Sequence, residues 1–130
     1  MLKVLVVNDS RVMLKMINGC LNDTYEVINC QGGDTLDFTN IKCLVVDTSR
    51  SAHPWQVIAR QGLKAGVPFI AITMGQDKET QIEVKALGGY GFISMPFTKD
   101  QLMDQVNGCI FHNGGAKQLA DIVGKNIQSL

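Results

Sequence analysis

Five short runs of apolar and β-branched residues recur along this 130-residue chain, at positions 2–7, 25–30, 42–46, 68–73 and 91–94. Between most of them, apolar residues repeat with the 3.6-residue period of an amphipathic helix. Strands that alternate with helices build right-handed βαβ units around a parallel sheet. Because the first, third and fourth runs are almost continuously apolar, the pattern predicts an α/β domain whose sheet is covered by helices on both faces.

Helix-starting residues mark three of the four connections and the segment after the last strand. Ser10 is a predicted N-cap, Pro54 opens a helix, and Asp77 caps a helix over about 78–87. Thr98 and Gln101 have the spacing of a capping box. The second connection, residues 32–40, has room for little more than two turns, so it predicts a short or irregular helix.

Three of these helices carry an apolar stripe that is expected to face the sheet. The predicted inward residues are Val12, Met13, Met16, Ile17, Cys20 and Leu21 in the first, Trp55, Ile58, Ala59 and Leu63 in the one after Pro54, and Leu102, Met103, Val106, Cys109 and Ile110 in the last.

Composition restricts the partners and the compartment. Lys plus Arg equals Asp plus Glu at 12 each, so no net field favours nucleic acid or an anionic membrane. The four cysteines lie in apolar stretches without a C-x-x-C pair and are interpreted as reduced core residues of a cytoplasmic protein. The chain shows neither a signal peptide nor a run of the roughly 20 apolar residues that spans a bilayer.

A glycine pair, Gly114 and Gly115, predicts a break near the end of the chain. We therefore expect one domain over residues 1–112 and a tail over 113–130. Residues 116–129 have the pattern of a further helix, with Leu119, Ile122, Val123 and Ile127 on one side. That apolar side is expected either to pack on the domain or to pair two chains as a homodimer.

Polar residues stand where the predicted strands end. Asn8 and Asp9 follow the first strand, Asp47 the third, and Thr73 closes the fourth. Ligands of open parallel sheets bind at the carboxyl ends of the strands. Two carboxylates brought together there repel each other, and Mg²⁺ relieves the repulsion. A carboxylate beside Mg²⁺ is also a possible nucleophile toward a phosphoryl group.

Over residues 2–111 the chain resembles the receiver domain of two-component response regulators. The opening NDSRVMLKMI is similar to the family's acidic pair followed by its first helix. CLVVD ends in Asp47, FIAIT ends in Thr73, and GGYGFISMPFT contains Phe92, all in the family's order. The resemblance implies a flavodoxin-like (CheY-like) fold with strand order 2-1-3-4-5.

The same resemblance implies roles for these residues. Asp47 would accept phosphate from a histidine kinase or a phosphotransfer protein, Thr73 would hydrogen-bond the phosphoryl group, and Phe92 would be the aromatic switch. Asp9, Asp47 and the backbone carbonyl of Ser49 would bind Mg²⁺. A downstream protein would bind the face formed by the helix over 78–87, the strand over 91–94 and the helix over 98–110.

The sequence departs from the family at charged positions. Asn8 replaces the first acid, so it would reach the metal only through a water molecule and Mg²⁺ would bind weakly. Met95 replaces the active-site lysine before Pro96, and a thioether cannot pair with a phosphoryl oxygen. Met74 is bulky and is expected to narrow access to Asp47. Arg50 is the nearest candidate for a substitute cation.

Three other interpretations stay open. Asp47 by itself could simply cap the turn after its strand. The domain could be a pseudo-receiver that binds partners without being phosphorylated, as Met95 and Asn8 suggest. A Mg²⁺-dependent phosphatase is the third, although the chain offers no second nucleophile or general base. The receiver interpretation predicts no enzyme activity beyond phosphorylation and dephosphorylation of Asp47 itself.

Overall fold

A computed structural model of the chain describes residues 1–31, 35–49 and 54–113. The strands are β1 (Lys3–Val7), β2 (Glu26–Cys30), β3 (Ile41–Asp47), β4 (Phe69–Met74) and β5 (Gly91–Met95). The helices are α1 (Arg11–Leu21), α2 (Trp55–Lys64), α3 (Lys78–Ala86) and α4 (Lys99–Asn107), and a π-helical segment, η1 (Gly108–Asn113), continues α4. Each predicted strand lies within one residue of its observed bounds.

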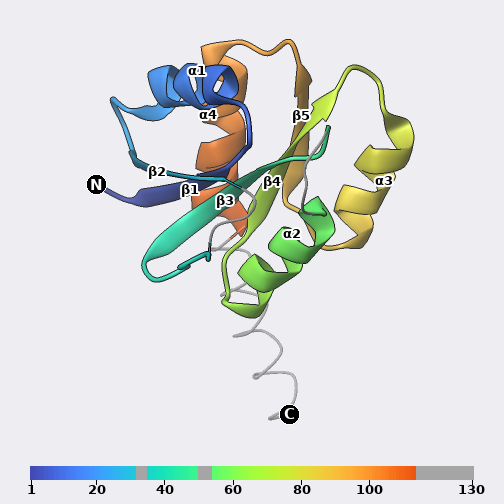
Figure 1. Cartoon of the computed structure of the whole chain (residues 1–130), viewed down its shortest axis with the longest axis horizontal. Helices are drawn as coiled ribbons and strands as arrows, with labels where there is room; N and C mark the ends of the chain where they lie inside the picture. Colours follow the sequence, from blue (N-terminus) through green and yellow to red (C-terminus); the bar gives the residue numbers. More distant parts are fainter. Residues whose placement is uncertain (32–34, 50–53, 114–130) are drawn as a thin grey trace, which may run out of the picture.

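The five strands form one parallel sheet in the order β2-β1-β3-β4-β5. This is the predicted flavodoxin-like topology, and β5 lies at one edge of the sheet. Figure 1 shows α1 and α4 together on one face and α2 and α3 on the other. The carboxyl ends of β3 and β4 lie side by side, since Asp47 is the register partner of Ile72.

The sheet separates two apolar cores. On the α1 and α4 face, Val4, Val6, Cys43, Val45, Ile70 and Ile72 of the strands pack with Ile17, Leu21, Leu102 and Val106 of the helices. On the other face, Leu5, Leu44, Val46, Phe69 and Ala71 pack with Trp55, Ile58, Ala59 and Val84. Adjacent strand residues enter opposite cores because strand side chains alternate between the two faces. The central strands are therefore almost continuously apolar, as predicted.

The predicted caps are confirmed. Ser10 Oγ accepts the backbone N–H of Met13, and Asp77 Oδ1 accepts that of Thr80. Thr98 and Gln101 form the reciprocal capping box at the start of α4. Each cap pairs backbone donors that the first helical turn leaves without intrahelical partners.

Two predictions were wrong. Val12 and Met16 of α1 do not face the core between the sheet and the α1 and α4 helices, since they are 82% and 37% exposed. The inward stripe is rotated toward Met13, Leu14, Ile17, Cys20 and Leu21. In the connection over 32–40, the described residues 35–40 are not helical. Instead, Leu36 and Phe38 pack against the core on the α2 and α3 face of the sheet, and Asp37 Oδ1 accepts the N–H of Thr39 in a turn.

Several predictions concern residues outside the described ranges, including Arg50, the tail helix over 116–129 and its pairing of two chains. All four cysteines are described, and all are free thiols. None of the helices in the described part of the chain combines the length and hydropathy needed to cross a bilayer.

Candidate functional site

Asp47 and Asn8 are in direct contact at the carboxyl edge of the sheet. Asp47 is the last residue of β3 and is half-buried, whereas Asn8 directly follows β1 and is only 4% exposed. Asn8 Nδ2 donates to Asp47 Oδ2 over 3.0 Å. Residues 39 positions apart thus meet because β1 and β3 are neighbours in the sheet.

The orientation of the Asn8 amide is determined by its neighbours. The backbone N–H of Ser10 donates to Asn8 Oδ1 over 2.8 Å. A backbone N–H only donates and a carboxylate only accepts, so the amide oxygen must face Ser10 and the nitrogen must face Asp47. Asn8 thus presents its NH₂ group, and not its oxygen, to Asp47. The oxygen is already paired with the start of α1.

The second oxygen of Asp47 is also occupied. Asp47 Oδ1 accepts the backbone N–H of Ser49 over 2.8 Å and the Ser49 hydroxyl over 2.6 Å. Together with Asn8, this makes three protein donors on one half-buried carboxylate. Such charge-assisted hydrogen bonds are stronger than hydrogen bonds between neutral groups.

The expected Mg²⁺ ligands were Asp9, Asp47 and the carbonyl of Ser49. Asp9 is exposed beside Asn8. Mg²⁺ requires oxygen ligands in near-octahedral geometry. Because an NH₂ group faces Asp47 and both oxygens of Asp47 carry donors, the described arrangement does not fit a tightly bound Mg²⁺ ion.

Thr73 belongs to a hydroxyl pair that includes a residue the sequence analysis missed. Thr73 is fully buried near the end of β4, and its Oγ1 lies 3.0 Å from Ser94 Oγ on β5. Gln81 Nε2 of α3 donates to the same Ser94 oxygen over 3.4 Å. Ser94 is the one polar residue of β5 and lies two positions after Phe92, on the same side of the strand. That alternation is the signal that could have identified it.

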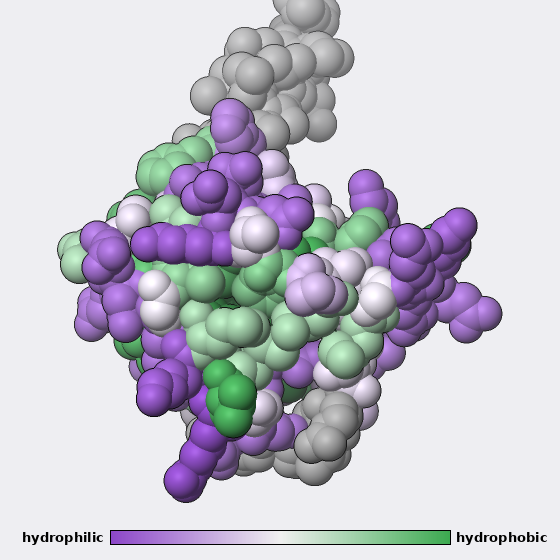
Figure 2. Space-filling model, turned by 90° about the horizontal axis from the view of Figure 1, so that it is seen from above, coloured by the Kyte–Doolittle hydropathy of each residue, from purple (hydrophilic) through white to green (hydrophobic). Residues whose placement is uncertain are grey.

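Two methionines occupy the β4 and β5 side of this edge. Met95 is half-buried and packs against the α1 and α4 core, and the bond from Met95 to Pro96 is cis. Its register partner is Met74, which is 56% exposed. On this side the edge therefore carries thioethers where the family resemblance implied a lysine. Figure 2 shows a face of the molecule with apolar surface at its centre and hydrophilic side chains around it.

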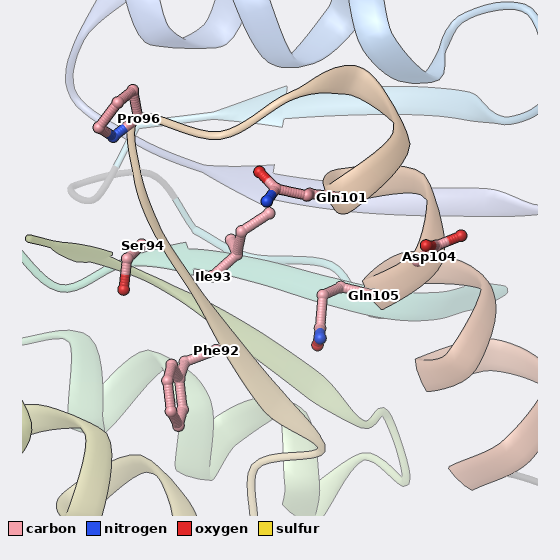
Figure 3. Close-up of a pocket in the computed structure, with 7 residues that line it drawn as sticks. All are labelled: Phe92, Ile93, Ser94, Pro96, Gln101, Asp104 and Gln105. Carbon is pink, nitrogen blue, oxygen red and sulfur yellow. The ribbon is translucent and has the colours of Figure 1, made fainter.

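Phe92 is half-buried on β5 and packs against the α2 and α3 core. Figure 3 shows Phe92 and Ser94 pointing to one side of the strand, whereas Gln101, Asp104 and Gln105 lie across it on α4. Phe92 lines a hollow of about 450 Å³ together with those α4 residues, and a second hollow of about 290 Å³ with α3. It therefore lies between the two helices of the predicted partner face.

No protein-family model matches the sequence, and no curated protein matches it either. Solved structures do match. A signal receiver domain from Vibrio parahaemolyticus is 16% identical, with a TM-score of 0.77 over 91% of this chain and 95% of the other. A response regulator receiver domain from Clostridium thermocellum is 21% identical, with a TM-score of 0.74 over 92% and 99%. A structure described as an adenylate cyclase from Rhodopirellula baltica is 15% identical, with a TM-score of 0.75 over 95% and 98%.

These similarities establish the fold. Both receiver domains are covered almost completely, and the strand order predicted from the family resemblance is the one observed. The chain therefore has the fold of response regulator receiver domains.

Proposed function

We propose that this chain is a receiver-type signalling domain that accepts a phosphoryl group on Asp47 and signals by binding another protein. The phosphoryl donor would be a histidine kinase or a phosphotransfer protein. The observation that carries the proposal is the position of Asp47 at the carboxyl end of β3, beside the strand that ends in Thr73 and Met74. In a sheet of this topology that edge is where ligands bind.

The first experiment is intact-mass spectrometry after incubation with acetyl phosphate, with and without MgCl₂. We expect a mass gain of one phosphoryl group that Asp47→Ala abolishes. Asp100→Asn is the matched control, because it removes an exposed acid that belongs neither to the acceptor nor to the proposed Mg²⁺ ligands. The same gain in Asp47→Ala would place the modification elsewhere and contradict the proposal.

A second candidate function is a pseudo-receiver that binds partners without phosphorylation. It is favoured by the three hydrogen bonds on Asp47 and by the apolar packing of Met95. Amide chemical shifts in ¹⁵N-labelled protein separate the two candidates. A phosphorylated receiver should show shifts in α3 and β5 after acetyl phosphate is added, whereas a pseudo-receiver should show none.

The partner would bind the face of α3, β5 and α4. Ile82 on α3 is 69% exposed beside Phe92, and Lys78 and Lys85 line the same hollow. Glu83 is not among the residues that line it and hydrogen-bonds Gln56 of α2 instead. This distribution favours a partner that presents an apolar side chain flanked by carboxylates. Substituting Ile82→Lys should weaken binding without affecting phosphorylation of Asp47.

The remaining parts of the proposal follow from the same interpretation. We propose that Asp9, Asp47 and the Ser49 carbonyl bind Mg²⁺ only weakly. We propose no enzymatic turnover beyond the phosphorylation and dephosphorylation of Asp47, and a lack of hydrolysis of phosphoester substrates would be consistent with this. The proposed compartment is the cytoplasm, where receiver partners and reduced thiols occur together. A homodimer through the tail remains a proposal.

A further inference from the structure

We propose that the Asn8 amide takes the place of a metal ion at Asp47, so that the carboxylate is held in position without a divalent cation. The inference rests on the site of the proposed function, and it applies whether or not Asp47 is phosphorylated. Its starting point is the contact of 3.0 Å between Asn8 Nδ2 and Asp47 Oδ2.

Burial, a backbone hydrogen bond and a side-chain hydrogen bond hold Asn8 in the position that makes this contact. Asn8 is 4% exposed, and its backbone N–H donates to the carbonyl of Cys30 at the end of β2. Its side-chain oxygen accepts the N–H of Ser10, whose hydroxyl caps α1. The amide therefore has one orientation in which all its neighbours are satisfied, and that orientation directs N–H bonds at Asp47.

The charge at this edge supports the same role. An acid at position 8 would add a third carboxylate beside Asp9 and Asp47, and repulsion among three carboxylates is relieved by a cation. Asparagine removes that charge and supplies a donor in its place. Ser49 donates to the other oxygen of Asp47, so hydrogen bonds from the protein stabilise the negative charge of this carboxylate without a cation.

The experiment compares wild type, Asn8→Asp and Asn8→Ala in MgCl₂ titrations without any phosphodonor, by isothermal titration calorimetry and by melting temperature. Wild type should melt at the same temperature in 0 and about 10 mM MgCl₂, since a ligand stabilises only by binding the native state. Asn8→Asp should melt below wild type without metal, recover with MgCl₂, and bind Mg²⁺ about tenfold or more tightly than wild type. Asn8→Ala, the matched control, removes the donor without adding a charge, so it should melt below wild type without metal and bind Mg²⁺ more weakly than Asn8→Asp.

A second measurement needs no variant. In ¹⁵N-labelled wild type, equimolar Mn²⁺ should not selectively broaden the amide signals of Asp9, Asp47 and Ser49. Selective broadening, or an equal response of wild type and Asn8→Asp to MgCl₂, would overturn the inference. Because no phosphodonor is present, these outcomes are independent of whether Asp47 can be phosphorylated.

Discussion

Thr73 Oγ1 lies 3.0 Å from Ser94 Oγ, so the hydroxyl proposed to bind a phosphoryl group is hydrogen-bonded to the neighbouring strand. Thr73 is fully buried, and Ser94 also accepts from Gln81 of α3. The acceptor edge of the sheet is thereby connected to α3 through two hydroxyl groups. Any movement of Thr73 toward Asp47 would have to break or lengthen this bond.

The first prediction concerns the energy of this hydroxyl pair. Ser94→Ala leaves the buried Thr73 hydroxyl without its partner, which should lower the free energy of unfolding by about 1 to 3 kcal/mol. In a double-mutant cycle with Thr73→Val, the coupling energy should be about 0.5 to 1.5 kcal/mol. Urea denaturation followed by fluorescence of Trp55, the single tryptophan, measures all four proteins. Additive effects of the two substitutions would show that the pair contributes nothing.

The second prediction concerns Met95. Met95→Lys would place a cation at the carboxyl edge, where a hydrogen bond to a charged group is worth roughly 1.5 to 3 kcal/mol. Phosphorylated Asp47 should therefore persist or accumulate about ten- to a hundredfold more than in wild type. Intact mass against time after removal of acetyl phosphate measures this. Met95→Leu keeps the apolar packing without the charge, so equal behaviour of the two variants would argue against a missing cation.

Much of the fold could be predicted from the sequence because its central strands, β1, β3 and β4, are buried on both faces. Their apolar runs are nearly uninterrupted, so even their ends fall within one residue of the observed positions. The caps at Ser10, Asp77 and Thr98 could also be predicted from the sequence, since each depends on residues no more than three positions apart. Asp47 and Asn8 could be placed at one edge because parallel strands share their carboxyl ends.

The errors arose where tertiary contacts decide between local alternatives. α1 carries two overlapping apolar stripes, and Leu14 rather than Val12 packs against the core that α1 forms with α4 and the sheet. The direction of the Asn8 amide depends on donors and acceptors at positions 10 and 47, which no local pattern reveals. Ser94 was missed because its alternation with Phe92 shows only which face of β5 the two residues share, and its contact with Thr73 depends on the register of β5 against β4.

The third prediction concerns packing of α2 on the sheet. A Cβ at Gly62 would lie 2.9 Å from Leu44 Cδ2 and 3.3 Å from Phe38 Cε1. Overpacking of a buried site costs about 1 to 3 kcal/mol, and the better helix propensity of alanine offsets at most about 1 kcal/mol. Gly62→Ala should therefore destabilise the protein by roughly 1 to 2 kcal/mol in urea denaturation.

Gly19 on α1 is the matched control for this substitution. A Cβ there would meet nothing within 4 Å, so Gly19→Ala should stabilise the protein by about 0.5 to 1 kcal/mol. If both variants shifted stability in the same direction, close packing at Gly62 would not be the explanation.

The last prediction concerns alkaline pH. Burial raises the pKa of the Cys43 thiol well above its ordinary value, and a hydrogen bond with Cys109 raises it further. The pKa of Tyr25 is raised as well, by burial and then by Cys43. Both groups are therefore harder to deprotonate in the folded protein than in the unfolded chain. Their contribution to stability is complete below the unfolded pKa values and is lost as the pH rises toward the folded ones.

The free energy of unfolding should thus be nearly constant to about pH 8 and should fall above about pH 9, where an unfolded thiol ionises. The slope should reach at most roughly 1.4 kcal/mol per pH unit for each proton released. Urea midpoints between pH 7 and 10.5 measure the decline. Cys43→Ala should reduce it and Tyr25→Phe should reduce its most alkaline part. Cys20→Ala leaves both buried groups in place and should show the same decline as wild type. An unchanged decline in the Cys43→Ala and Tyr25→Phe double variant would assign the pH dependence to other residues.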